Sequence, residues 1–396
     1  MKRNREAGQA IASVALGLVV LTGIVGLAID MGYLRYQKRR MQSAADSAAI
    51  AGASELAYAS GNYVAAAKND SKTNGFEDGV NGVTVTSSNP PVDAPFSSVA
   101  NANSYVEVRV HQDVPTFFMR VFGVNTTSLN ATAVAELGSS RGCVYSLDLV
   151  LGITLGGNNL SAPNCGVVDN AILDLGGGCI TASSIGVVLN LLGGCANPAP
   201  VIGIAPSPDP LGYINAPAAG VCQPNPNVSQ AAPPVLLNPN TYCSGITIGP
   251  ANAAPVVFSP GLYIVGPPGL QIQGTGSVTA TGAVFFIANG ASVQIIGPGT
   301  TSLTAPTGTT GGIPGGVLFF QDRTNLLPAT ITNPNLSLTG ALYFPTAQLT
   351  LGSNNPAAPY LILVAQSIQL QGNVTIGTDY SSLTNGSPIK GAVLVQ

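Results

Sequence analysis

Residues 282–290 read "GAVFFIANG", a short apolar run that ends in turn residues. Residues of these types favour β-strands, and the run is too short for a typical helix. Comparable runs lie on both sides, with starts roughly 20 to 35 residues apart: "GLYIVG" (261–266), "GVLFFQD" (316–322), "GALYFPTAQLTL" (340–351) and "YLILVAQSIQLQGNVTIG" (360–377). This spacing matches one turn of a parallel β-helix, whose coils must stack to bury their apolar faces.

The composition changes sharply near residue 141. From residue 142 onward the chain has only two basic residues, Arg323 and Lys390, and six acidic ones, with 36 Gly and 26 Pro. We predict that residues 142–396 form a Gly-, Asn- and Pro-rich β-solenoid of about ten coils, on the order of 50 Å long, with a β-sandwich as the alternative. The net charge of −3 gives no sign of nucleic-acid binding.

The N-terminal region contains a candidate membrane anchor. Residues 10–29, from Ala10 to Ile29, carry no charge and no proline. As a helix they span roughly 30 Å, the hydrocarbon thickness of a bilayer. A buried core helix and a cleaved signal peptide are the alternatives, but the run is longer than a signal core and no A-x-A site follows it. A basic flank follows instead: Arg35, Lys38, Arg39 and Arg40.

All six cysteines lie after residue 141: Cys143, Cys165, Cys179, Cys195, Cys222 and Cys243. They lack metal-ligand spacing and therefore indicate an oxidising compartment. Because the basic residues on both sides of the anchor are nearly balanced, the cysteines decide the predicted orientation. Residues 1–9 would be cytoplasmic, the anchor a single pass through a bacterial inner membrane, and the rest periplasmic or extracellular.

The connectivity of the cysteines stays open at this stage, and free thiols are an alternative. Sequential pairing (143–165, 179–195 and 222–243) would join neighbouring coils or loops. The Pro-rich stretch 198–220 has little to pack with, so a bridge between Cys222 and Cys243 would fix the chain just after it.

Residues 30–141 read as a small α+β segment. The Ala-rich stretch 42–70 continues the apolar helix outward, with a break expected near Ser60 and Gly61. Strands are expected at 82–88, 104–114 and 126–137, and a short helix at 115–123 that begins at Pro115 and ends at Gly123. A long apolar helix leading into a small antiparallel sheet is the plan of a pilin-like subunit.

The first 141 residues resemble TadG-like proteins of the Tad (tight adherence) Flp-pilus assembly family. The likeness lies in the apolar helix, the "AIDMG" of residues 28–32, the basic cluster, the "QSAADSAAIAG" of residues 42–52 and the later "VPTFFMRVFG". The resemblance implies a membrane-associated pilus-assembly component whose partners are the inner membrane and other pilin-like subunits. The "CVYSLD" of residues 143–148 and later β-rich segments are similar to the C-terminal region of certain TadG-related proteins.

Catalytic chemistry has weak support. Asp322 and Arg323 are the one acid–base pair in the second half, and adjacent strand residues point to opposite faces. We expect a coil corner, in which Asp322 accepts backbone N–H groups and Arg323 lies over the next coil. No cofactor, metal or catalytic site is expected.

Three functions remain to be compared. The first is a structural component of Tad-type pilus assembly or surface display. The second is an anchored carbohydrate-binding or adhesive β-helix with surface glycans as partners, which rows of exposed tyrosines on one face would favour. The third is a polysaccharide enzyme centred on Asp322.

Overall fold

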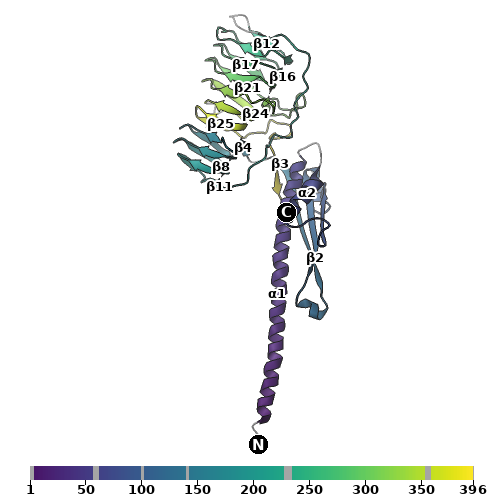
Figure 1. Ribbon diagram of the computed structural model, residues 1–396. Helices are drawn as coiled ribbons and strands as arrows, with labels where there is room; N and C mark the ends of the chain where they lie inside the picture. The colour runs from purple at the N-terminus through teal and green to yellow at the C-terminus, as the bar shows by residue number, and fades with distance from the viewer. Residues whose placement is uncertain are drawn as a thin grey trace. The chain divides into compact units, whose positions relative to one another are not determined.

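The computed structural model describes residues 4–56, 62–99, 102–139, 142–226, 234–352 and 358–395. It divides the chain into two compact units. The first unit comprises Met1–Gly138 and Gly391–Gln396, and the second comprises Ser139–Lys390. Figure 1 shows the elements of both.

The first unit is a long helix with a small sheet. Helix α1 (Asn4–Glu55) is continuous over 52 residues, so the apolar segment and the Ala-rich segment form one helix, as predicted. The expected break at Ser60 and Gly61 lies outside the described residues. The sheet has the strand order β1-β2-β3-β27. The remaining bounds are α2 (Tyr63–Thr73), β1 (Val83–Ser88), β2 (Tyr105–Pro115), β3 (Thr126–Ser139), β27 (Lys390–Leu394), and the 3₁₀ turns η1 (Phe96–Ser98), η2 (Ala102–Ser104) and η3 (Met119–Phe122).

The core of this unit lies between the Ala-rich half of α1 and the sheet. Alternate valines of β2 are fully buried, and so is a stripe of α1 side chains: Val106, Val108, Val110, Met41, Ala44, Ala45, Ala48, Ala49 and Ala53. The valines share one face because side chains alternate along a strand. The small helix residues let the helix backbone approach the sheet closely.

Two details of the first unit differ from the sequence-based expectation. Residues 391–396 do not belong to the solenoid but return to the first unit, where the Val395 N–H donates to Val134 O at 2.9 Å. Pro115 ends strand β2 rather than starting a helix, and the helical turn begins only at Met119. Gly123 does end that turn, with a left-handed φ of 84°.

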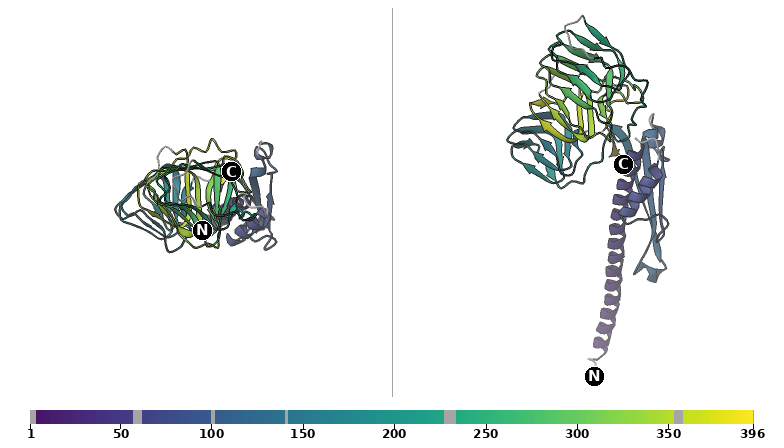
Figure 2. Two further views of the ribbon diagram at one scale, coloured as in Figure 1. Left: turned by 90° about the horizontal axis from the view of Figure 1, so that it is seen from above. Right: turned by 45° about the horizontal axis from the view of Figure 1, so that its top comes forward.

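The second unit is a parallel β-solenoid of about ten turns, which excludes a sandwich. Its strands lie on three faces, and strands of neighbouring turns pair in parallel. Figure 2 shows the stack from two further sides. Four long strands turn corners and contribute to more than one face. Three of them contribute to two faces: β6 (Leu160–Asp169), β8 (Cys179–Val187) and β25 (Leu361–Leu370). Strand β24 (Leu336–Leu351) contributes to all three, because it pairs with β21, β22 and β23.

The shorter strands are assigned to the faces by their pairing. The first face holds β4 (Gly142–Ser146), β11 (Val201–Ile202), β13 (Thr241–Tyr242), β16 (Gly261–Val265), β19 (Ala283–Ile287) and β22 (Val317–Gln321). The second holds β5 (Ile153–Thr154), β7 (Ile172–Asp174), β9 (Asn190–Leu192), β14 (Ile246–Ile248), β17 (Gly269–Ile272), β20 (Ser292–Ile295) and β23 (Ala329–Ile331). The third holds β10 (Cys195–Asn197), β12 (Val235–Leu237), β15 (Val256–Phe258), β18 (Val278–Thr281), β21 (Thr301–Thr304) and β26 (Val374–Thr375).

The chain does not run along the stack from one end to the other. It enters in the middle at β4 and winds to one end, which it reaches at β11. The segment that follows β11 leads to the opposite end, where β12, β13 and β14 form the outermost turn. Its described residues 203–226 are here called the crossover. From there the chain winds back until β25 pairs with β4, at residues 363–365 against 144–146. The colours of Figure 1 show this order, with teal strands at both ends and yellow strands between them.

Stacked aromatic side chains fill the interior beneath the first face. Ring centroids of Tyr263 and Phe285 lie 5.2 Å apart, and those of Phe285 and Phe319 lie 5.3 Å apart. On the other side of the same strands, Phe286, Phe320 and Tyr343 are also buried. These strands are buried on both sides because the crossover and the segments around Ile313 and Ile389 cover their outer side. The crossover adds Leu211 and Ile214 to the core, and the other two segments add Ile313 and Ile389. Strand β19 is therefore an unbroken apolar run.

One recurrent corner depends on glycine. The pairs Gly156–Gly157, Gly176–Gly177 and Gly193–Gly194 all have φ between 55° and 91°. A residue with a Cβ rarely adopts this left-handed conformation, so paired glycines let successive turns bend at the same place. If Gly194 were replaced by a residue with a Cβ, that atom would lie only 2.2 Å from Gly178 O of the preceding turn, which is too close.

Candidate functional site

The first candidate site is the apolar half of α1. The large apolar side chains from Ile11 to Val25 are 57–71% exposed, whereas the Ala-rich half is buried against the sheet. Among the described residues, this is the one helix long and apolar enough to cross a membrane. The predicted anchor ends at Ile29, which is 50% exposed, and Ala10 lies within the same helix. Such a continuous apolar surface needs a non-aqueous partner.

Asp30 lies where the exposed half of the helix meets the domain, and its carboxylate organises the loop between β2 and β3. It accepts hydrogen bonds from the backbone N–H groups of Phe117, Phe118 and Met119 at 3.0, 2.9 and 2.7 Å. Asp30 is only 1% exposed. The sequence resemblance pointed to both "AIDMG" and "VPTFFMRVFG", and the structure shows that the two segments are bonded to each other.

A groove beside this loop separates α1 from β3. Its volume is about 630 Å³, and its lining combines apolar side chains with two cations: Met31, Leu34, Met119, Leu129, Thr127, Ser128, Asn130, Arg35 and Lys38. The Lys38 ammonium donates to Asn130 O across the groove. Of the remaining basic flank, Arg39 is exposed and Arg40 lies 5.5 Å from the centroid of the Phe76 ring.

The structure places Asp322 and Arg323 at a corner of the solenoid, in separate roles. Asp322 accepts bonds from the Thr324 N–H at 2.8 Å and the Thr324 hydroxyl at 2.6 Å, and so forms a local turn. Arg323 points over the next turn, where its guanidinium lies 5.4 Å from the centroid of the Tyr343 ring. The two side chains do not form a common site.

Arg323 instead holds the crossover against the first face. Its Nη2 donates to Leu211 O at 3.2 Å and to Gly212 O at 3.1 Å, and its Nε donates to the Tyr343 hydroxyl at 3.0 Å. That hydroxyl in turn donates to the carboxylate of Asp209 in the crossover. We call Asp209, Arg323 and Tyr343 the crossover clasp. Burial raises the pKa of Asp209, against the lowering effects of Tyr343, the Leu211 N–H and the Arg323 charge.

A second contact holds the crossover nearer to its start. The Asn170 side chain donates to Ser207 O at 2.8 Å and accepts from the Ser207 N–H at 2.8 Å. The crossover also buries Leu211 and Ile214 in the solenoid core. The prediction that residues 198–220 have little to pack with was therefore wrong for this part of the stretch, because long-range stacking supplies an apolar surface that composition does not reveal.

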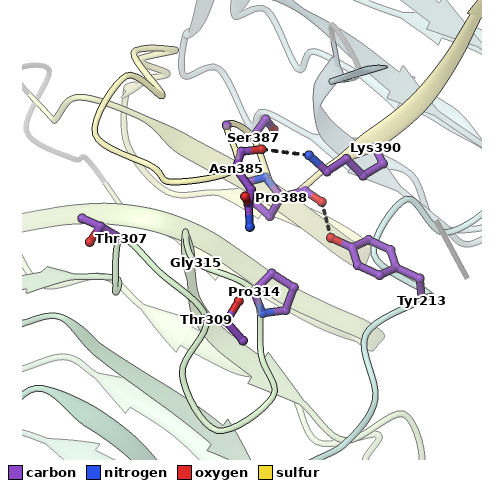
Figure 3. Close-up of a pocket in the computed structure, with 10 residues that line it drawn as sticks. Tyr213, Thr307, Thr309, Pro314, Gly315, Asn385, Ser387, Pro388 and Lys390 are labelled. Atoms are coloured by element: carbon purple, nitrogen blue, oxygen red, sulfur yellow. Dashed lines mark hydrogen bonds between the residues drawn. The ribbon is translucent and has the colours of Figure 1, made fainter. Parts of the chain in front are cut away.

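A pocket of about 190 Å³ lies within the covering layer of the first face. It is lined mainly by polar and small residues: Tyr213, Thr307, Thr309, Pro314, Gly315, Asn385, Gly386, Ser387, Pro388 and Lys390. Figure 3 shows Thr309 and Pro314 on one side and the segment of Asn385 to Pro388 on the other. Lys390 donates to Asn385 O at 2.9 Å and Tyr213 to Pro388 O at 2.5 Å. Ligand pockets are usually larger, at about 300–1,000 Å³.

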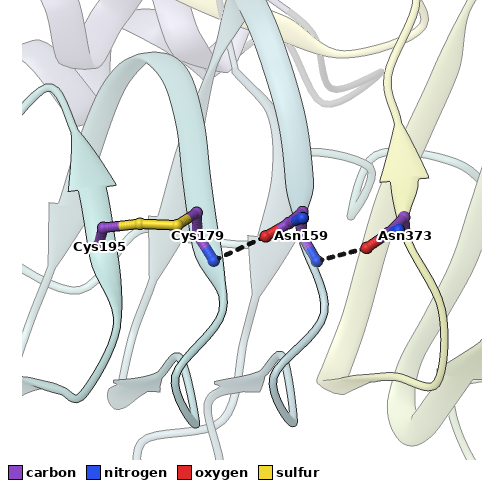
Figure 4. The surroundings of a disulfide bond; sticks show 4 residues. All are labelled: Asn159, Cys179, Cys195 and Asn373. Carbon is purple, nitrogen blue, oxygen red and sulfur yellow. Dashed lines mark hydrogen bonds between the residues drawn. A yellow bond between two sulfur atoms is a disulfide. The ribbon is translucent and has the colours of Figure 1, made fainter.

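All six cysteines form disulfides, in the sequential pairing 143–165, 179–195 and 222–243. The first two join neighbouring turns, and the third joins the crossover to the outermost turn. Figure 4 shows Asn373, Asn159, Cys179 and Cys195 in a row across successive turns. The Asn159 N–H donates to Asn373 Oδ1 at 2.9 Å, and the Cys179 N–H donates to Asn159 Oδ1 at 3.0 Å. The disulfide thus continues an asparagine ladder toward the end of the stack.

Neither a metal site nor exposed rows of tyrosines, the features expected of an enzyme or a glycan-binding solenoid, are found among the described residues. Within the described residues, no group of three or more His, Cys, Asp and Glu side chains could hold a metal ion. Asp169 is buried and accepts the N–H groups of Ile153 and Ala171 at 2.8 and 2.9 Å, which is a structural arrangement. The seven tyrosines of the solenoid, all within its described part, are buried or half-buried: Tyr145, Tyr213, Tyr242, Tyr263, Tyr343, Tyr360 and Tyr380.

Two family models match the first part of the chain. Residues 8–55 match the family described as Flp pilus-assembly TadE/G-like, and residues 43–135 match the family described as Tad-like Flp pilus-assembly. Because the two matches together span residues 8–135, which lie in the first unit, we call it the TadE/G-like unit. Asp30 lies in the first match and its three backbone donors in the second, so this contact joins the two matched segments of the TadE/G-like unit. No curated protein and no solved structure matches the chain.

Proposed function

We propose that this protein is a membrane-anchored structural component of a Tad-type pilus assembly or surface-display system. The observation that carries the proposal is the contrast within α1. One half is buried under the sheet of a TadE/G-like unit, and the other half exposes an uninterrupted apolar surface about as long as a bilayer is thick. The TadE/G-like unit would hold the solenoid at the membrane, where other pilin-like subunits assemble.

The proposed orientation has the N-terminus in the cytoplasm and the solenoid outside the inner membrane. Three disulfides in the second unit support an oxidising compartment for that unit. We propose a structural rather than a catalytic role, because Asp322 and Arg323 have separate structural partners. The glycan-binding alternative has little support, because the solenoid tyrosines are not exposed in rows.

The anchoring proposal is tested by fractionation and protease protection in the native host. We expect the protein to resist extraction by salt and alkaline carbonate, to dissolve in detergent, and to lose its solenoid to protease added to spheroplasts. Leu18→Arg with Leu21→Arg should release it, because each charge at the centre of a membrane helix costs about 2.5–3.5 kcal/mol. Ser43→Arg, on the exposed side of the same helix beyond the span, is the matched control. A wild-type protein found soluble, or a protected solenoid, would contradict the proposal.

Assembly is tested separately by co-purification. A tagged full-length protein should be recovered with pili or with the membrane assembly platform. Recovery of the membrane-bound protein alone, from cells that make pili, would argue against a role in the pilus system while leaving the anchor intact.

A further inference from the structure

Among the described residues of the TadE/G-like unit outside α1, the loop between β2 and β3 holds the two most exposed large apolar side chains. Val121 is 81% exposed and Phe122 is 71% exposed, while Phe117 and Phe118 are about half exposed. The loop is nevertheless well ordered by its own backbone. Thr116 N–H donates to Asn125 O at 3.0 Å, and Val124 N–H donates to Met119 O at 3.2 Å. A structured loop that presents aromatic side chains outward indicates a contact with something apolar.

The position of the loop along α1 indicates what that contact is. A Cβ at Gly26 would lie 2.7 Å from the Phe118 ring, so this ring sits directly on Gly26. The Phe117 ring packs edge-on against Tyr33, with centroids 5.2 Å apart. The loop therefore lies at the level of residues 26–33 of α1, where the apolar span ends. Figure 1 shows the end of the β2–β3 hairpin beside α1.

The charges around the loop suit the boundary of a bilayer. Asp30, at the same level, is shielded by three backbone N–H donors. Arg120, the loop's own cation, donates to Thr116 O through Nε at 3.0 Å and Nη2 at 2.7 Å. Beyond the loop, Arg35 lies six residues after Ile29, about 9 Å further along the helix and at the depth of lipid headgroups. Aromatic residues gather at this boundary in membrane proteins.

We infer that residues 117–124 insert into the interfacial region of the bilayer on the solenoid side, and that Asp30 positions the loop for this contact. The occupant of the exposed apolar surface is thus lipid, because the surface is continuous with the exposed apolar half of α1 and bounded by the basic flank. The loop would set the depth of α1 in the membrane. This inference rests on the proposed membrane anchoring.

The chain contains no tryptophan, so a single introduced tryptophan reports on its own surroundings. We would reconstitute three full-length variants in phosphatidylcholine–phosphatidylglycerol vesicles that contain lipids brominated either near the headgroup or near the chain end. The variants are Phe122→Trp in the loop, Val19→Trp in the apolar half of α1, and Val92→Trp at an exposed position elsewhere in the unit. Bromine quenches tryptophan only at close range.

We expect Phe122→Trp to lose emission mainly with the shallow bromine, Val19→Trp mainly with the deep bromine, and Val92→Trp with neither. If Val19→Trp is quenched but Phe122→Trp behaves like Val92→Trp, the loop does not contact lipid and the inference fails while the anchor stands. If Val19→Trp is not quenched either, the proposed membrane anchor itself fails.

The role of Asp30 is tested in the Phe122→Trp background. Asp30→Ala removes the carboxylate that accepts the N–H groups of Phe117, Phe118 and Met119, and should abolish the preference for the shallow bromine. Val19→Trp with Asp30→Ala should still be quenched by the deep bromine. Asp30→Glu keeps a carboxylate and should restore part of the preference. An unchanged quenching profile in Asp30→Ala would overturn the positioning role.

Discussion

The crossover clasp leads to the sharpest prediction about the solenoid. Arg323→Ala removes two bonds to crossover carbonyls, one bond to the Tyr343 hydroxyl and the stacking on Phe320 and Tyr343. It also leaves the carboxylate of Asp209 without its nearby cation. A hydrogen bond that involves a charged group contributes about 1.5–3 kcal/mol. Three such bonds are lost, but Arg323 is half-exposed and water can replace part of its bonding, so we expect a local loss of about 3 kcal/mol in total.

The assay is amide hydrogen exchange resolved to peptides of the solenoid. A loss of 3 kcal/mol in local opening free energy should accelerate exchange about 100-fold at Leu211, Gly212 and Ile214. Strands β17 and β20, on another face, should change little. Tyr343→Phe removes only one hydroxyl and should give a smaller effect of about 1–2 kcal/mol.

Asp322→Asn is the matched control, because an amide oxygen can still accept the Thr324 N–H and keep the corner. We expect it to stay within about 0.5 kcal/mol of the wild type. Equal effects of Asp322→Asn and Arg323→Ala would refute the assignment of separate roles. Uniform acceleration over the whole solenoid would show that the crossover is not a local tether but part of one cooperative unit.

Three further predictions follow from particular contacts. Burial raises the pKa of Tyr360 to about 12. Its contribution to the free energy of unfolding is therefore complete below the unfolded pKa of about 10 and is lost as the pH rises through about 12. The pKa difference corresponds to about 2.7 kcal/mol. In a spectrophotometric titration, Tyr360→Phe should therefore remove a late-titrating phenol, and an identical late phase in both proteins would count against this burial. The Cys222–Cys243 disulfide closes a loop with a sequence separation of 21 residues and stabilises the fold by about 3 kcal/mol. Reduction should expose residues 196–240 to protease while residues 260–396 stay largely intact. Loss of the whole solenoid at once would disprove a local role for the disulfide. Removing residues 391–396 should uncover the edge of β3 and destabilise the TadE/G-like unit. The exposed edge should also promote dimers, which size-exclusion chromatography detects. A truncated protein that stays monomeric and equally stable would contradict the role of β27 in covering this edge.

The solenoid could be predicted because its strands are local features of the sequence. The run at 282–290 contains strand β19, and its length and flanking turns were sufficient to identify it. The paired-glycine corners also left a signal that was missed, the repeated "LGG" at 155–157, 175–177 and 192–194. Two consecutive glycines after leucine mark a left-handed corner, since other residues rarely adopt that conformation.

Contacts between distant segments could not be predicted from local sequence patterns. Asp30 next to an apolar span needs partners, yet nothing in its spacing identifies Phe117, 87 residues away, as one of them. Arg323 likewise has its main acceptors in the crossover, more than 100 residues earlier. The predicted solenoid range, 142–396, included the residues of strand β27, and only its pairing with β3 shows that they complete the other sheet.

The path of the chain explains why the crossover needs its contacts. Ten turns at about 4.8 Å each make a stack of about 50 Å, so a chain that ran from end to end would leave far from where it entered. Here entry at β4 and the final turn at β25 are neighbours, which lets the chain return to β3 as β27 and complete the sheet of the TadE/G-like unit. The return along the stack is moved to the segment between β11 and β12, whose residues 203–234 could extend to about 100 Å, more than the length of the stack. Asn170, the clasp and Cys222 hold the crossover at three separate turns of the stack, and the solenoid can then be carried as an insertion between two adjacent strands of the TadE/G-like unit.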